Sequence, residues 1–94
     1  MVRYLRLEII TGEDTKEPAS VRKVELERRT KGVRVKFTYE DGKSIESTAR
    51  GIAINDLNLY LHIKHYLQGI ARHISEFRRL HGLNPYTRIA EWIV

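Results

Sequence analysis

The sequence predicts an α+β fold, in which a four-stranded antiparallel meander packs against one long helix that is followed by a short final helix. Three observations indicate this class. Apolar and polar residues alternate in the first half of the chain, apolar residues recur every three or four positions in the second half, and glycine-containing turn sequences separate the alternating segments. The 94 residues are expected to form a single domain (1–94), with the sheet in 2–52, the long helix in 56–81 and the short helix in 85–93.

The strands follow from alternation with a period of two. In residues 3–10 the leucines and isoleucine at odd positions face one side, and polar residues face the other. The same pattern predicts strands at 21–30 and 33–39, and a fourth strand after the next turn. The polar, locally acidic stretch 11–20 is expected to be a loop. The sequence does not give the strand order, because the first strand can join either edge of the meander.

Two turns set the strand registers. A two-residue turn at Lys31-Gly32 is expected to join the second and third strands, and a three-residue loop ending in a left-handed Gly42 to join the third and fourth. The first turn pairs Leu26 with Phe37, Glu27 with Lys36 and Arg29 with Arg34. The second, Glu40-Asp41-Gly42, pairs Phe37 with Ile45, Val35 with Ser47 and Lys36 with Glu46. Lys36 then lies between two glutamates in an acid-base-acid ladder.

The long helix has recognisable ends and an apolar face. Asn55 or Asp56 is expected to cap its start, and Gly82 follows its last residue, where left-handed glycines end helices. Gly69, inside the helix, is expected to permit close approach of another helix or strand. The helix would be about 37 Å long and a nine-residue strand about 30 Å, so one apolar end should overhang the sheet and attract a second chain. The apolar stripe comprises Tyr60, Ile63, Leu67, Ile70, Ile74 and Phe77, widened by Leu59, Tyr66, Ala71 and Leu80.

The last ten residues also have a helical pattern. Asn84-Pro85 suits the cap and first residue of a short helix. Its apolar face would contain Tyr86, Ile89, Ala90 and Ile93. Because so short a helix is marginal in water, it is expected to dock on its own long helix or on a partner's.

Composition limits the class of protein. The chain has 17 Lys and Arg against 12 Asp and Glu, a net charge of +5, and residues 21–50 hold nine of these cations and five of the anions. Such a basic excess suits an anionic partner. The absence of Cys excludes disulfides and cysteine-based zinc sites. No apolar run approaches the roughly 20 residues of a bilayer span, so a cytoplasmic protein is expected. The many Arg and Ile resemble the composition of a thermophile's protein.

The sequence contains no pattern typical of catalysis or metal binding. The four histidines, His62, His65, His73 and His81, all fall on the long helix, and no Asp or Glu lies within four residues of the first two to complete a ligand set. Neither a nucleophile elbow nor a phosphate-binding glycine loop is present. We therefore expect no enzyme, no cofactor and no metal, with the histidines as surface or interface groups.

The outward face of the sheet is the candidate binding surface. Guanidinium groups bind phosphate and stack on bases, and tyrosine offers a further stacking plane. The opposed Arg29 and Arg34 would be unfavourable unless their side chains were splayed apart, screened or neutralised by an anion. Either Arg22 or Lys23 faces outward. The expected nucleic-acid-binding residues are Tyr4, as the stacking group, and Arg6, Arg22, Arg29, Arg34, Lys36 and Arg50, as phosphate ligands. Because Glu8, Glu25, Glu27 and Glu46 interrupt this set, a solvated face of mixed charge is the alternative.

The order of elements also suggests a family. The strand sequence VRKVELERRTKGVRVKFTYEDGKSIESTAR, followed by the helix sequence INDLNLYLHIKHYLQGIARHISEFRRL, resembles small single-strand-binding domains of the transcriptional coactivator p15 type. The chain is most similar to the ThermoDBP-related proteins of thermophilic archaea. This resemblance covers nearly the whole chain and rests on element order and charge. It implies binding of single-stranded DNA or RNA with little sequence preference, in an oligomer built through helices.

Two functions are therefore expected to compete. The first is a module that binds single-stranded DNA or RNA electrostatically, as a homodimer or higher homo-oligomer formed through the helices. The second is a protein-interaction module that uses the long helix, around Ile70, Ile74, Phe77 and Leu80, together with the final helix containing Trp92. The sequence does not separate DNA from RNA and does not fix the oligomer number.

Overall fold

A computed structural model describes residues 1–12 and 20–94 of the chain. It confirms the α+β class, the first four strands and the long helix. Residues 13–19, which form most of the loop expected at 11–20, lie outside the described residues. The elements in chain order are β1 (Tyr4–Ile10), β2 (Val21–Arg29), β3 (Gly32–Tyr39), β4 (Ser44–Arg50), α1 (Leu57–Leu80) and β5 (Arg88–Ile93).

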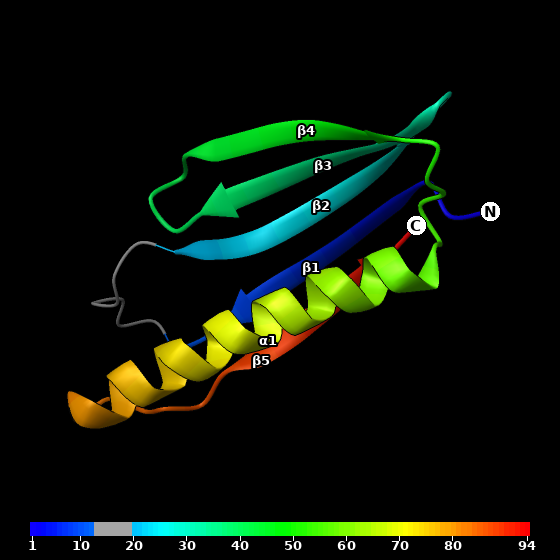
Figure 1. Cartoon of the computed structure of the whole chain (residues 1–94). Helices are drawn as coiled ribbons and strands as arrows, with labels where there is room; N and C mark the ends of the chain where they lie inside the picture. The colour runs from blue at the N-terminus through cyan, green and yellow to red at the C-terminus, as the bar shows by residue number, and fades with distance from the viewer. Residues whose placement is uncertain (13–19) are drawn as a thin grey trace.

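The sheet has five strands, one more than expected, and α1 crosses one of its faces (Figure 1). The strand order is β4-β3-β2-β1-β5, and every neighbouring pair is antiparallel. Of the two edges that the sequence left open for the first strand, β1 therefore takes the one beside β2. The helix packs on β1, β2 and β5, whereas no Cα atom of α1 lies within 8 Å of one in the fully described strands β3 and β4. The helix thus covers only part of the sheet.

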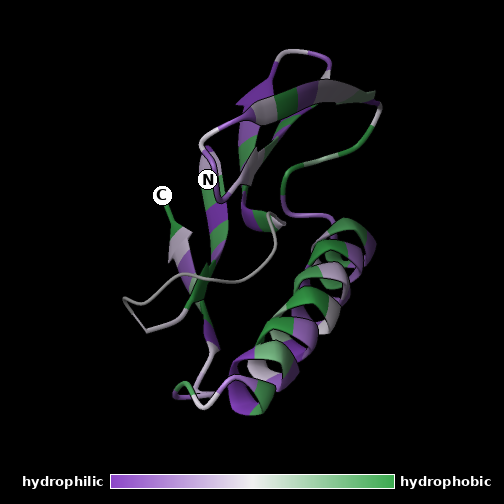
Figure 2. Cartoon of the chain, turned by 90° about the vertical axis from the view of Figure 1, so that its left-hand side faces the viewer, coloured by the Kyte–Doolittle hydropathy of each residue, from purple (hydrophilic) through white to green (hydrophobic). Residues whose placement is uncertain are grey.

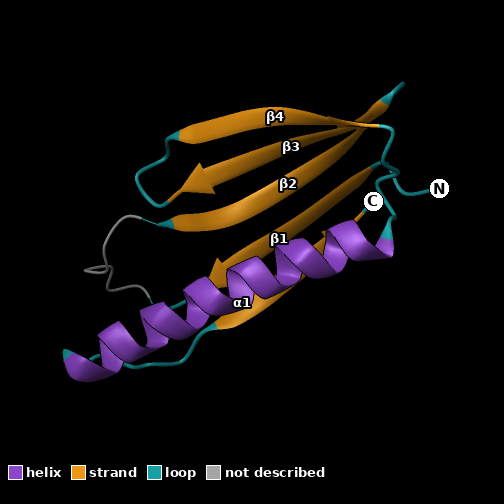
Figure 3. Cartoon of the chain, viewed as in Figure 1, coloured by secondary structure: helices purple, strands orange, loops and turns teal. Residues whose placement is uncertain are grey.

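The prediction of a short final helix at 85–93 is wrong, because residues 88–93 of this segment form β5, which pairs with β1 (Figure 3). Leu5, for example, lies opposite Ile93. A lone helix of this length is marginal, whereas the β-branched and aromatic side chains of RIAEWI suit a strand. Pairing also satisfies the backbone groups along the edge of β1, which would otherwise be open.

A polar cluster anchors β5 beneath the helix. Glu91 points from β5 toward α1, where the Tyr60 hydroxyl donates a hydrogen bond to its Oε1. Lys64 Nζ lies 3.3 Å from the Tyr60 oxygen and 3.5 Å from Glu91 Oε1. The hydrogen bond to Tyr60, with the nearby Tyr60 and Glu91 charges, raises the pKa of Lys64 above its ordinary value. The cluster joins the last strand to the first half of the helix.

The register expected between the second and third strands is wrong. The turn is Thr30-Lys31, and Gly32 is already the first residue of β3. The expected Lys31-Gly32 turn gave Leu26–Phe37, Glu27–Lys36 and Arg29–Arg34, whereas the observed pairs are Leu26–Val35, Glu27–Arg34 and Arg29–Gly32. Both registers keep the apolar residues on one face, so alternation alone did not distinguish them.

The position of Gly32 explains the observed register. A Cβ atom added there would lie 2.1 Å from the carbonyl oxygen of Ala49 in β4, and the Gly32 φ angle is +155°. Gly32 is therefore needed inside the sheet, where β3 and β4 approach closely, rather than in the turn.

The hairpin between β3 and β4 has the expected register. Its loop is Glu40-Asp41-Gly42, and Gly42 has the expected positive φ, 89°. The Asp41 carboxylate accepts a hydrogen bond of 3.0 Å from the backbone N–H of Lys43, which fixes the turn. The confirmed pairs are Phe37–Ile45, Val35–Ser47 and Lys36–Glu46.

The ends of α1 also agree with the sequence. Of the two candidate caps, Asp56 fulfils the role, since its Oδ1 accepts a 2.9 Å hydrogen bond from the Leu59 N–H. At the other end, Gly82 follows the C-cap residue with a φ of 70°.

Hydrophobic and hydrophilic residues alternate along the strands (Figure 2). The core consists of Leu5, Leu7, Ile9, Val21, Val24, Leu26, Val33, Val35, Ile54, Ile63, Leu67, Ala71 and Ile74.

The buried face of the helix ends in a charged residue that the sequence pattern missed. Arg78 is only 2% exposed. Its Nε donates a 2.6 Å hydrogen bond to the carbonyl oxygen of Asn84, and a Cβ added to Gly12 would lie 2.7 Å from its NH2 group. Arg78 therefore holds together the segment after β1 and the segment before β5.

The expected overhang of the helix is present, since the C-terminal end of α1 extends past the ends of the strands (Figure 1). Its apolar surface is smaller than the stripe suggested. Ile74 is buried and Ile70 packs against the core, which leaves Leu80, 69% exposed, as the main apolar side chain at this end.

Replacing Gly32 with alanine is expected to reduce the free energy of unfolding by about 1–3 kcal/mol, because the new methyl group collides with the β4 backbone. Urea unfolding followed by circular dichroism measures this loss. The matched control is Gly69→Ala, where a Cβ meets no described atom within 4 Å. Within this chain Gly69 therefore does not serve the expected close packing, and alanine there should stabilise the helix by up to about 1 kcal/mol. Equal effects of the two substitutions would contradict this account.

Arg78→Ala is expected to cost about 2–4 kcal/mol of stability, since it leaves a cavity and an unpaired carbonyl group in a buried site. The adjacent Arg79→Ala is the control. Arg79 pairs with Glu76 on the surface, with its side chain 61% exposed, so its loss should leave the stability nearly unchanged. Thermal and urea unfolding of both variants test the difference, and similar losses would show that Arg78 is not a structural tie.

Candidate nucleic-acid interface

The outward face of the sheet is a ladder of alternating charges. The observed registers place Glu46, Lys36, Glu25 and Arg6 side by side on β4, β3, β2 and β1, and Trp92 follows on β5. Each cation thus has a carboxylate on a neighbouring strand. The part of the sequence-predicted site that lies in this row is largely neutralised by the protein itself.

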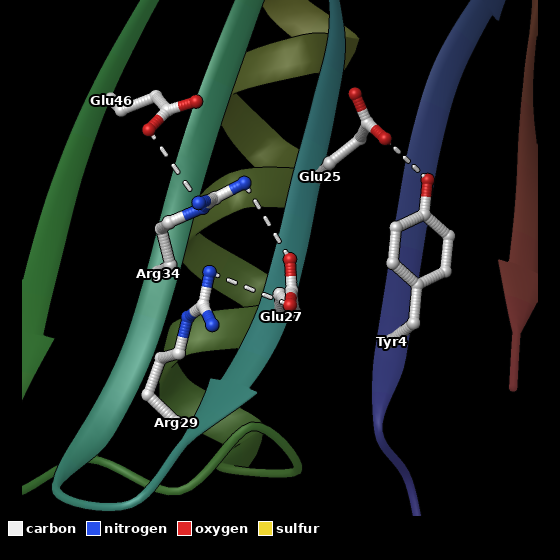
Figure 4. Close-up of polar contacts among 6 residues, drawn as sticks. All are labelled: Tyr4, Glu25, Glu27, Arg29, Arg34 and Glu46. Atoms are coloured by element: carbon white, nitrogen blue, oxygen red, sulfur yellow. Dashed lines mark hydrogen bonds and ion pairs between the residues drawn. The ribbon is translucent and has the colours of Figure 1, made fainter.

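The arginine pair that suggested an anion site is resolved by glutamates (Figure 4). Arg34 lies 3.6 Å from Glu27 and 3.8 Å from Glu46, while Arg29 lies 3.5 Å from the same Glu27. The two arginines share a carboxylate rather than facing each other. No anion is needed between them, so this pair does not indicate an anion site.

Tyr4 is hydrogen bonded rather than open for stacking. Its hydroxyl donates a 2.6 Å bond to Glu25 Oε2 (Figure 4). Burial, this hydrogen bond and the Glu25 charge together raise the pKa of Tyr4 to about 12. Partial burial raises the pKa of Glu25, but the Tyr4 hydrogen bond and the charges of Lys23 and Lys36 outweigh it, so this pKa lies below its ordinary value.

The exposed aromatic group on this face is one that the sequence missed. The guanidinium carbon of Arg6 lies 3.7 Å from the ring centroid of Trp92, the only tryptophan of the chain. The Nε of Arg6 lies 3.8 Å from Glu8 Oε1. Trp92 is 40% exposed. The sequence pattern predicts a helix for this segment, whereas the outward position of Trp92 follows from its pairing with Arg6 across β5 and β1. The Arg6 guanidinium is therefore stacked on the indole ring, and planar groups of this kind are the ones on which a nucleobase can stack.

The remaining expected phosphate ligands are dispersed. Arg22 lies at the far end of β2 from the turn, where its NH2 group pairs with Glu40 at 3.2 Å. A register shift between Val21 and Lys23 leaves both Arg22 and Lys23 half-buried, which explains why their orientation was ambiguous. Lys36 lies between two glutamates by register. Arg50 is exposed at the end of β4, opposite Gly32.

A cluster of four cations lies at the end of the sheet that contains the β2–β3 turn. We call this cluster the basic end, and it consists of Arg3, Arg28, Arg29 and Lys31. Arg28 donates its backbone N–H to the Arg3 carbonyl at 3.0 Å, which brings the two residues together. Arg29 contacts Glu27, whereas Arg3, Arg28 and Lys31 have no carboxylate within 4 Å in the part of the chain that the structure describes. Only Arg29 of this cluster was in the sequence-predicted site.

A hollow of about 860 Å³ lies within the basic end. Its walls come from the β2–β3 turn, the segment between β4 and α1, and the terminal residues of the chain. Arg28, Arg29 and Lys31 supply its cations, and Val94 lines it two residues after Trp92. At the rise of a strand, the tryptophan is therefore about 7 Å along the chain from the hollow.

The described residues contain no group of three or more His, Cys, Asp or Glu placed to bind one metal ion. Among residues 1–12 and 20–94, no helix has the length and apolar character needed to cross a bilayer.

The chain matches no protein-family model, and no curated protein or solved structure is significantly similar to it.

The Tyr4 hydrogen bond gives a testable titration. The pKa of Tyr4 is raised from 10 to about 12, so its contribution to stability is fully present below pH 10 and is lost as the pH rises through about 12. Absorbance titration of the tyrosines at alkaline pH should show a late phase near pH 12 that disappears in Tyr4→Phe. Glu25→Gln should shift that phase toward pH 10. If both variants retain the late phase, another tyrosine is responsible.

Proposed function

We propose that this chain binds single-stranded nucleic acid electrostatically, with the phosphates held at the basic end. The observation that supports this most strongly is the contrast between the two cationic regions. On the outward face, Arg6 and Arg34 each have a carboxylate within 4 Å. Arg28 and Lys31, which line the hollow, have none in the part of the chain that the structure describes. Cations without protein partners are the ones available to replace the counterions of a phosphate backbone.

The neighbouring aromatic surface favours a single strand over a duplex. Bases in a duplex are stacked on each other, whereas a single strand can place a base on a protein side chain. Trp92 and Arg6 provide such a surface close to the hollow. The proposed site therefore combines phosphate contacts at the basic end with one stacking position on β5 and β1. It contains Arg6 and Arg29 from the sequence-predicted set and replaces the others.

The competing protein-interaction function has less support. It used a final helix that is instead a strand, and Ile70 and Ile74 pack in the core of their own chain. We therefore keep nucleic-acid binding as the proposal.

Fluorescence anisotropy of labelled single-stranded and duplex oligonucleotides, at about 50 and 200 mM salt, tests the proposal. We expect tighter binding to the single strand, a steep loss of affinity with salt, and quenching of Trp92 fluorescence. The double variant Arg28→Gln/Lys31→Gln should reduce the salt slope by about 1.4, from about 0.7 for each lost phosphate contact.

The matched control removes the same charge from the outward face. Lys23→Gln/Arg34→Gln has the same net charge as the first variant but loses only cations that lie beside carboxylates. It should bind nearly as tightly as the original chain. Equal weakening by both variants would show that net charge alone attracts the ligand, and no binding at about 50 mM salt would contradict the proposed function.

A further inference from the structure

The strand β4 is an open edge of the sheet, and its sequence is suited to antiparallel pairing with β4 of a second copy of the chain. Six of its seven residues are exposed, including Ile45 at 57%. On the other face, no Cα atom of α1 lies within 8 Å of one in β3 or β4, and the contact seen there is between side chains, with Tyr66 of α1 6.1 Å from Phe37 of β3 between ring centroids. Natural proteins usually protect such an edge with charge, a bulge or a covering element.

The ladder between β3 and β4 determines which backbone groups are free. Tyr39 donates its N–H to the Lys43 carbonyl at 2.8 Å, and Gly51 donates to the Lys31 carbonyl at 3.1 Å. In an antiparallel pair these bonds recur at every second residue, so the odd-numbered residues of β4 bond to β3. The N–H and C=O groups of Ser44, Glu46, Thr48 and Arg50 therefore point away from the sheet.

We propose that two copies of the chain pair through β4, with Thr48 opposite Thr48 of the second copy on the two-fold axis. Pairing of the free groups requires an even-numbered residue opposite an even-numbered one, which allows only a few registers. In the register centred on Thr48, Glu46 lies opposite Arg50 of the second copy, and the symmetry repeats this pair.

Neighbouring registers are less favourable. Centring on Glu46 would place two glutamates opposite each other. Centring on Ser47 would leave Glu46 opposite a threonine and Arg50 opposite a serine. The register centred on Thr48 is thus the one in which each charged residue of β4 meets an opposite charge, which is why we commit to a second copy of this chain as the occupant.

This dimer differs from the helix-mediated oligomer expected from the sequence. Most of the apolar stripe of α1 packs against the core of its own chain, whereas the β4 edge is exposed. The two sheets would join into one, with the two basic ends directed oppositely. The proposal does not depend on nucleic-acid binding, because none of Arg3, Arg28, Arg29 and Lys31 lies on β4.

Sedimentation analysis of the pure chain tests the dimer. We expect a mass near twice that of the 11.1 kDa chain at about 100 μM, with dissociation on dilution. Thr48→Pro should weaken association at least tenfold, since it removes an outward N–H that β3 does not use. A chain that stays monomeric at about 100 μM would overturn the proposal. So would a dimer that Thr48→Pro leaves unchanged, which would point to association through the helices.

Charge exchange tests the register itself. Glu46→Arg should weaken association, because it places two arginines opposite each other at both ends of the paired strands. The double variant Glu46→Arg/Arg50→Glu should restore the affinity of the original chain to within about threefold. Failure of the double variant to recover, with its fold intact by circular dichroism, would exclude the register centred on Thr48.

A cysteine cross-link provides an independent measurement. The chain has no Cys, so Thr48→Cys introduces a single thiol. Directly opposed residues in a hydrogen-bonded pair have Cα atoms about 5.5 Å apart, which is within disulfide range. Oxidation should give a covalent dimer with Thr48→Cys and little with the control Ser44→Cys, which has no symmetric partner in this register. The reverse result would overturn the proposed pairing.

Discussion

The width of a single helix limits what this chain can bury. A helix is about 10 Å across, and neighbouring strands lie about 4.8 Å apart, so one helix covers two or three strands. In this protein the last strand adds beside β1, and α1 lies over β5, β1 and β2. Of the other two strands, β3 still buries Val33 and Val35, whereas β4 is exposed at six of its seven residues and forms an open edge. The place where β5 joins the sheet thus decides which part of the surface is free to contact other molecules.

Charge follows the same division between satisfied and free groups. On the outward face the strand registers place acids beside bases, and Arg34 alone contacts two glutamates. Where the ladder ends, at the β2–β3 turn, the cations outnumber the carboxylates. A binding surface in this small domain is defined less by how many arginines a strand contains than by which of them lack a carboxylate on the adjacent strand.

Much of the fold could be predicted from the sequence, because its signals were local. Alternation gave four strands, and Asp56 and Gly82 marked the helix ends. The errors concerned partners that are distant in sequence. Helical and extended patterns were both compatible with residues 85–93, and only the unpaired edge of β1 decided between them. Likewise, two registers satisfied alternation between β2 and β3, and the close approach of Ala49 to Gly32 selected one. The misplaced register then produced the false arginine pair in the candidate site.

The position of β1 in the sheet has a consequence for how the chain folds. The meander β2-β3-β4 contains only contacts between segments close in sequence, and it can form early. By contrast, Leu5 must pair with Ile93, a contact that spans almost the entire chain. Contacts of such high sequence separation are slow to form, because the entropy of closing the loop is lost before the contact is gained. During synthesis, the outer edge of β1 stays unpaired until β5 has left the ribosome.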